Sequence, residues 1–154
     1  MKTKVEKLVR EPCEVEITGA TLLTVDEAND LLTVEDRACG SWWWLRSPGY
    51  CEDAAVDVDE DGFVHVFGGT VRGYSVGVRP ALKIENLASA NLEIGDEFYI
   101  GEQRFKVISD HLALCDLIVG YSRFDSKGND YENSEIKAYV DHWFEELMNW
   151  GAEA

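Results

Sequence analysis

The chain has 154 residues, of which 45% are hydrophobic and 29% charged, a composition typical of a globular protein that forms its own core. Thirty acidic residues against fourteen basic ones give a formal net charge of -16 at pH 7. A surface of that charge repels phosphate groups and anionic lipids, so we expect neither direct nucleic-acid binding nor membrane association.

The first predicted elements are a short strand, a short helix and an extended aromatic segment. Residues 12–19 alternate apolar and acidic side chains, as a half-buried strand does. Thr24 and Glu27 have the spacing of a capping box, which predicts the start of a short helix. Residues 42–45 follow as a strand, which residues 47–49, Ser-Pro-Gly, bring to an end.

A hairpin and a further extended run come next. Residues 55–58 and 63–67 alternate apolar and polar positions on either side of the polar turn at residues 59–62, which is the pattern of a β-hairpin. The sequence GYSVGVRPALKI, residues 73–84, then reads as one extended run. Pro80 would lie at an edge or a bulge of this run, because proline has no backbone N–H.

The second half of the chain predicts a second hairpin and a long helix. Residues 98–110 form the hairpin, with its turn near Gly101, and residues 112–124 are a candidate for a continuation of the sheet. Residues 131–150 form the clearest helix, with Ser134 as its N-cap. An apolar stripe at helical spacing predicts a face that packs on the core, with a partner-binding face as the alternative. The stripe consists of Ile136, Tyr139, Val140, Trp143, Phe144 and Leu147.

The tryptophan segment predicts a structural brace. In a strand, Trp42, Trp44 and Arg46 lie on one face and Trp43 lies on the other. Arg46 can stack its guanidinium on an indole while it pairs with a carboxylate, and Arg79 can do the same from a neighbouring strand. The alternative is an aromatic wall that faces a ligand.

The motifs WWLRSPG (43–49) and GVRPALKI (77–84), with TLLTVDEANDLL (21–32) before them, resemble a family of uncharacterised bacterial and phage domains. That family is in turn similar to the C-type-lectin-like fold of the sulfatase-modifying, formylglycine-generating domains. The resemblance implies an α+β fold in which the Trp-Arg and Gly-x-Arg segments are neighbouring core strands. Its sheet would be mixed but mainly antiparallel, with a short N-terminal helix and a longer C-terminal amphipathic helix.

A second, weaker resemblance covers residues 94–114 and 124–144, which are similar to the part of that family that normally precedes the tryptophans. Here this part follows them. The resemblance therefore implies a single domain, residues 1–154, whose halves, residues 12–86 and 92–150, stand in permuted order. Such rearrangements are tolerated when chain termini lie close together on the surface.

No motif indicates catalysis, a metal or a cofactor. Residues 57–62 match the first half of a calcium loop, but Gly68 stands where the bidentate glutamate is required, so a solvated hairpin turn is the preferred interpretation. The three histidines are scattered. Cys39 and Cys51 do not match the cysteine pair of the sulfatase-modifying enzymes, so we predict no such activity and no enzyme.

The four cysteines lack zinc or redox spacing, and neither a secretion signal nor a bilayer-length apolar run is visible, which predicts a cytoplasmic protein.

The function predicted from these features is a non-catalytic, acidic protein-interaction module. Its sharper form is a phage or mobile-element anti-defence inhibitor that mimics nucleic acid and blocks a basic, nucleic-acid-binding host protein. Residues 67–69 and 72–74 would form a flexible loop at the tip of the sheet. The predicted contact residues are Asp57, Asp59, Glu60, Asp61, Arg72 and Tyr74. The alternative is a small-ligand or glycan-binding domain that uses Trp42, Trp44 and Tyr74 for stacking. An acidic surface that serves only solubility is the simplest alternative.

Overall fold

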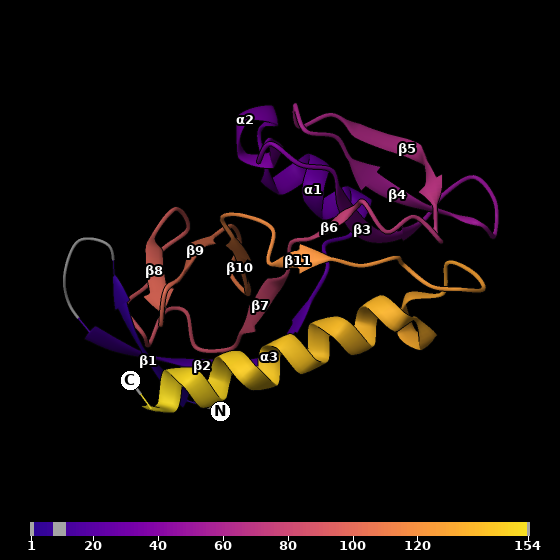
Figure 1. Cartoon of the computed structure of the whole chain (residues 1–154). Helices are drawn as coiled ribbons and strands as arrows, with labels where there is room; N and C mark the ends of the chain where they lie inside the picture. The colour runs from indigo at the N-terminus through magenta and orange to yellow at the C-terminus, as the bar shows by residue number, and fades with distance from the viewer. Residues whose placement is uncertain (1, 8–11, 154) are drawn as a thin grey trace. The chain divides into compact units, whose positions relative to one another are not determined.

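The structure, a computed structural model, describes residues 2–7 and 12–153 of the chain, and the side chains of residues 15–149. It is a mixed α+β fold with two mainly antiparallel sheets, short helices near the N-terminus and a longer helix at the C-terminus (Figure 1). The predicted α+β class, with its short N-terminal and longer C-terminal helix, is therefore confirmed.

The chain divides into two compact units that each take segments from both halves of the sequence. One unit consists of Met1–Thr21, Ala81–Asp116 and Asp141–Ala154, and the other of Leu22–Pro80 and Leu117–Val140. The predicted halves, residues 12–86 and 92–150, do not coincide with these units. We call the first the barrel unit and the second the sheet unit.

The barrel unit is a closed barrel of six strands within the described residues. In sheet order they are β1 (Lys2–Lys7), β2 (Pro12–Thr21), β7 (Ala81–Ile84), β10 (Leu112–Cys115), β9 (Gln103–Val107) and β8 (Glu97–Ile100). The predicted hairpin around Gly101 is confirmed as β8–β9. Phe98 and Phe105 stack across it with 5.6 Å between ring centroids, and the ring of Trp143 lies 6.2 Å from Phe105. These aromatic rings give the barrel unit its own core.

The sheet unit contains a five-stranded sheet in the order β11-β6-β3-β4-β5. The strands are β3 (Trp43–Pro48), β4 (Ala54–Val58), β5 (Val64–Thr70), β6 (Gly77–Val78) and β11 (Gly120–Tyr121). The predicted hairpin is confirmed as β4–β5, with Asp57 opposite His65 and Val58 opposite Val64. Strands β3 and β6 are parallel neighbours, so the Trp-Arg and Gly-x-Arg segments lie side by side.

The prediction that residues 73–84 form one extended run is wrong. Only Gly77–Val78 and Ala81–Ile84 are strands, and they belong to different sheets. Arg79 and Pro80 separate them. Proline offers no backbone N–H to a ladder, so a sheet readily ends at this position.

Capping boxes start both short helices. For α1 (Val25–Leu31) the prediction is confirmed, since the Thr24 hydroxyl accepts from the Glu27 amide at 3.1 Å and the Glu27 carboxylate accepts from the Thr24 amide at 2.8 Å. The second helix, α2 (Val34–Arg37), was not predicted. The same reciprocal bonds join Thr33 and Asp36 there, and their spacing was the signal that could have identified this helix.

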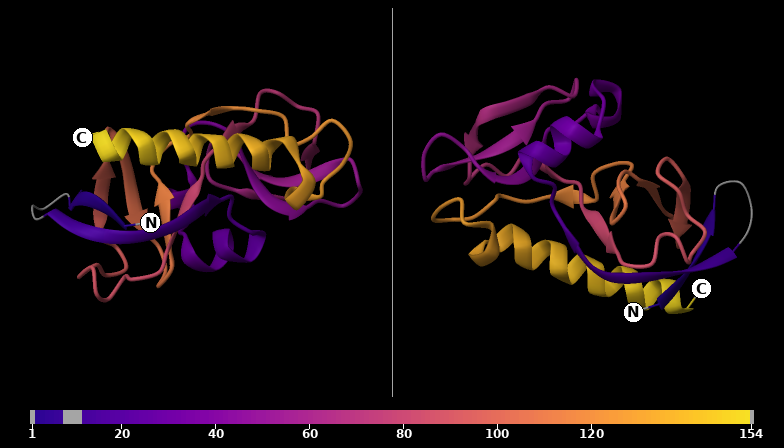
Figure 2. Two further views of the ribbon diagram at one scale, coloured as in Figure 1. Left: turned by 90° about the horizontal axis from the view of Figure 1, so that it is seen from below. Right: turned by 180° about the vertical axis from the view of Figure 1, so that it is seen from behind.

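The C-terminal helix α3 (Glu135–Glu153) follows the single-turn helix η1 (Tyr131–Asn133) and is continuous in all views (Figure 2). The Ser134 hydroxyl accepts from the Lys137 amide at 3.1 Å, which confirms the predicted N-cap. Every residue of the predicted apolar stripe is buried or half-buried, so the stripe packs on the core. In the described part of the chain, none of the helices combines the length and the apolar character that crossing a bilayer requires.

Substitutions at two glycines test whether the β4–β5 turn packs closely against α2. Gly62 has φ +94, and a Cβ there would lie 2.2 Å from the Val34 carbonyl oxygen, whereas Gly40 has φ +79 and open space around it. We expect Gly40→Ala to lower the free energy of unfolding by about 1 kcal/mol, the backbone cost alone, and Gly62→Ala to lower it by about 3 kcal/mol or more. Urea denaturation measures both. Equal losses would contradict this close contact.

Candidate functional site

The predicted brace exists for Trp43 and Arg79. Both side chains are buried, and the Arg79 guanidinium lies over the Trp43 ring, 4.9 Å from its centroid. Both also donate to one acceptor, the carbonyl oxygen of Arg37, from Trp43 Nε1 at 3.0 Å and from Arg79 Nη1 at 3.2 Å. The two sequence motifs are thus joined by stacking and by a shared hydrogen-bond acceptor.

Arg37 itself was missed by the sequence analysis. Its guanidinium is buried and donates to three carbonyl oxygens, those of Gly62 at 2.8 Å, Leu32 at 2.9 Å and Ala28 at 3.1 Å. These bonds connect α1, α2 and the β4–β5 turn. A single arginine at the end of a polar segment is indistinguishable in sequence from a solvated one, so no local signal marked it.

The other half of the predicted brace is corrected. Arg46 lies over the ring of Tyr131, 5.8 Å from its centroid, and not over an indole. Its carboxylate partner is Glu132 at 3.9 Å, and both groups are exposed. Trp44 packs edge-on against Phe124 with 5.6 Å between centroids.

The three tryptophans at positions 42–44 differ in burial and in the groups that they contact. Trp43 and Trp44 are fully buried, and Trp44 Nε1 donates to the Ser122 carbonyl at 2.8 Å. Trp44 therefore has no free face for a ligand, which removes it from the predicted stacking platform. Trp42 is 37% exposed and lies over the His65 ring, with 4.9 Å between centroids.

Asp57 was predicted to contact a partner, and the structure contradicts this because its side chain is buried. The residue is only 4% exposed, and its Oδ1 has no hydrogen-bond partner among the described residues. Burial raises the pKa of its carboxyl to about 6, although the nearby His65 opposes the shift. Asp57 lies opposite Trp44 on β3 and His65 on β5, in the middle of the sheet.

The Asp59 carboxylate makes its contacts within the turn that Asp59 begins. Its Oδ1 accepts from the amides of Asp61 at 2.9 Å and Phe63 at 3.0 Å, and its Oδ2 contacts His65 Nε2 at 2.8 Å. The His65 hydrogen bond lowers the pKa of Asp59. The D-x-D-x-D-G pattern is thus a hairpin turn, as preferred in the sequence analysis. Among the described residues, no three metal-ligating side chains gather into a candidate metal site.

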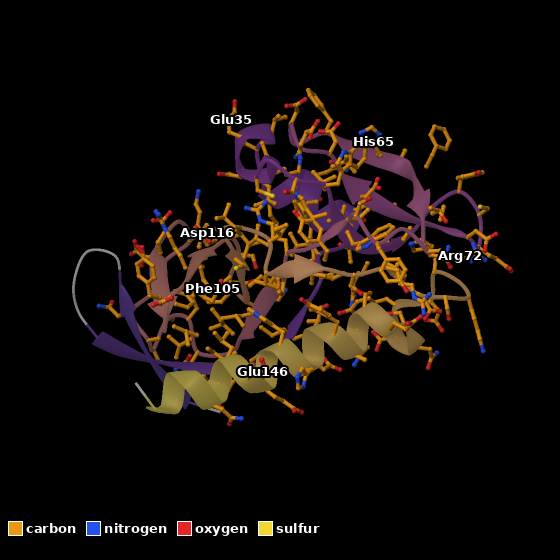
Figure 3. All side chains as sticks on the ribbon, viewed as in Figure 1. Glu35, His65, Arg72, Phe105, Asp116 and Glu146 are labelled. Atoms are coloured by element: carbon orange, nitrogen blue, oxygen red, sulfur yellow. The ribbon has the colours of Figure 1, made fainter. Side chains whose placement is uncertain are left out.

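The remaining predicted contact residues are exposed. Glu60 and Asp61 lie at the tip of the turn. Arg72 follows the end of β5 (Figure 3) and pairs with Asp53 at 3.1 Å. Tyr74 is exposed, and the Arg123 guanidinium lies over its ring, 5.3 Å from the ring centroid. The structure does not gather all six predicted residues into one surface, because Asp57 is buried and Asp59 is held within the turn.

Exposed apolar side chains along β5 were missed. Phe67 and Tyr50 are each 73% exposed and pack edge-on against each other, with 6.1 Å between centroids. Phe63 and Val66 are also more than half exposed. The predicted loop at residues 67–69 is wrong, because these residues belong to β5. We call Tyr50, Phe63, Val66, Phe67, Glu60 and Asp61 the hairpin surface.

Residues 11–86 match the model of a family described as a domain of unknown function (DUF6273). The match covers 76 of the 154 residues and includes both the WWLRSPG and the GVRPALKI motif. None of the curated proteins and none of the solved structures matches the chain. The likeness to the C-type-lectin-like fold and the permuted order of the halves stay predictions.

The brace predicts a difference between the two arginines. We expect Arg79→Lys to lower the free energy of unfolding by about 2 kcal/mol, since lysine keeps the charge but loses the planar stacking on Trp43 and the directed bond to the Arg37 carbonyl. Arg46→Lys should cost less than about 0.5 kcal/mol because its ion pair is exposed. Chemical denaturation of both variants measures this. Equal costs would contradict a brace centred on Trp43.

Asp57 predicts a pH dependence of stability. Its carboxyl ionises near pH 3.8 when unfolded and near pH 6 when folded, so the folded state holds the proton longer and stability falls as the pH rises from 4 to 6. The free energy of unfolding of Asp57→Asn, relative to that of wild type, should therefore rise by between about 1 and 3 kcal/mol from pH 4 to pH 6. Above pH 7 this difference should stay constant. Denaturation at a series of pH values measures the difference. A difference that does not change between pH 4 and pH 6 would contradict the burial of this charge.

Proposed function

We propose that the chain is a non-catalytic protein-interaction module that binds its partner through the hairpin surface. The observation that carries this proposal is the exposure of Phe67 and Tyr50. These two large aromatic side chains pack against each other and are not buried in the core. Exposed aromatic residues that gather on one strand are typical of interaction surfaces, where they supply most of the binding energy.

The charge of the chain indicates the nature of the partner. Glu60 and Asp61 are exposed in the turn before β5, and the whole chain carries -16. A basic surface complements this arrangement and is attracted over long range. We propose a nucleic-acid-binding protein as the partner, whose basic groove the acidic residues occupy in place of phosphates. In this form the chain is an anti-defence inhibitor of a phage or mobile element, acting in the cytoplasm of the bacterium or infected host.

Capture of a partner from bacterial lysate tests the proposal. The tagged wild-type chain should retain a basic protein that rising salt releases and added DNA displaces, because the contact is electrostatic. Two double variants, Tyr50→Ala/Phe67→Ala and Glu60→Lys/Asp61→Lys, should each reduce the retained partner at least ten-fold.

The matched control is Ile94→Ala, which removes a 65% exposed apolar side chain from the barrel unit. It should retain the partner like wild type, and circular dichroism should show all variants folded. If both double variants retain the partner as well as wild type does, the hairpin surface is not the binding site and the proposal fails.

A further inference from the structure

Strand β5 is an open edge of its sheet. It is the last strand in the order β11-β6-β3-β4-β5, and within the described residues it pairs with β4 alone. The opposite edge, β11, has two residues, whereas β5 has seven. The barrel unit is closed and so offers no comparable edge. The longest open row of backbone groups in the described sheets therefore lies along β5 (Figure 1).

Strand β5 carries neither an Asp, Glu, Lys or Arg side chain nor a proline on its edge, although a register shift interrupts its ladder with β4 between His65 and Gly69. Proteins normally place charged side chains or proline on edge strands, since an unprotected edge pairs with other chains. The strand reads VHVFGGT and contains neither. An edge without repelling charges is what a binding strand requires.

The ladder directs part of the β5 backbone outward. The Asp59 amide donates to the Phe63 carbonyl at 2.9 Å, and two positions further along the same ladder Asp57 is opposite His65. In an antiparallel pair, hydrogen-bonded positions alternate. The N–H and C=O groups of Val64 therefore point away from β4. Beyond His65 the register with β4 shifts, and the Phe67 carbonyl accepts from the Tyr50 amide at 3.1 Å. The Val66 side chain is 57% exposed.

Acidic residues lie at both ends of this strand. Glu60 and Asp61 are exposed in the turn before it. At the other end Ala54 is opposite Thr70, and the Val71 amide donates to the Asp53 carbonyl at 2.8 Å, so Asp53 lies beside the end of β5, where its carboxylate pairs with Arg72 at 3.1 Å. The exposed Glu52 precedes Asp53 in sequence. Seven strand residues span about 20 Å, which separates the two acidic groups by the length of a short extended segment.

We propose that β5 receives an extended segment of the partner protein as an added strand. The segment has apolar side chains in its middle and a basic residue at each end, where the acidic groups lie. Backbone hydrogen bonds to Val64 would provide affinity, and the flanking charges would provide selectivity, as in other complexes formed by strand addition. A second copy of the chain is disfavoured, because each copy carries -16. This inference rests on the proposed function and specifies how its partner binds.

A peptide selection tests this mode of binding. The full chain is used to select binders from a random nine-residue peptide library, and the selected peptides are then synthesised with a fluorescent label. We expect alternating apolar positions between basic ends. N-methylation of alternate backbone nitrogens should weaken binding at least ten-fold, because it removes strand hydrogen bonds and leaves the side chains in place. Fluorescence polarisation measures the affinities.

Two lysine substitutions provide the matched pair of variants. Val66→Lys places on the edge the charge that natural edge strands use for protection, and Ile94→Lys adds the same charge at a similarly exposed position of the barrel unit. We expect Val66→Lys to bind the selected peptides at least ten-fold more weakly than Ile94→Lys does, and to lose the lysate partner as well.

Several results would overturn strand addition. These are a failure to select peptides, equal binding of the N-methylated peptides, equal binding by the two lysine variants, and self-association through β5 in analytical ultracentrifugation. The proposed function can survive such a failure. In that case the partner is still lost with Tyr50→Ala/Phe67→Ala and with Glu60→Lys/Asp61→Lys, while N-methylation leaves the binding of the selected peptides unchanged.

Discussion

The sheet unit depends on the hydrogen bonding of one residue, Arg37. Its carbonyl oxygen accepts from Trp43 and Arg79, and its buried guanidinium donates to the carbonyls of Ala28, Leu32 and Gly62. A buried cation is costly unless its N–H groups are satisfied, so these carbonyls must remain in place. These bonds therefore hold α2 against α1, the β4–β5 turn, strand β3 and the residue that follows β6.

This arrangement determines which side chains are left for function. The core buries Trp43, Trp44 and Arg79, so these side chains are not available to a partner. Tryptophan and arginine are nevertheless the residue types most often found at binding hot spots. The interaction surface that we propose lies instead at the far end of the sheet, where β5 has no further neighbour among the described strands. Tyr50 reaches that end because the chain turns after β3, and there it supports Phe67. The core fixes the position of the strand whose outer edge we propose to be functional.

Local patterns in the sequence were sufficient for much of the fold. The capping box at Thr24, the N-cap at Ser134 and the two hairpins depend on residues a few positions apart, so their signals are complete in a short window. The split of residues 73–84 between two sheets was missed because strand periodicity is the same whichever sheet a strand joins. The interleaving of the two units was missed because it depends on which distant strands pair.

The sequence by itself determined the α+β class, the acidic charge and the stacking of an arginine on a tryptophan of the WWWLR run. It also predicted an interaction role, which stays a proposal. Only the tertiary structure decided that Asp57 is buried, that Arg79 rather than Arg46 stacks on an indole, and that Phe67 is exposed on an edge strand. The physical reason is that burial belongs to a neighbourhood of segments distant in sequence. The identity of an aspartate or a phenylalanine does not determine whether its side chain is buried. The strands that pack around the side chain determine its burial.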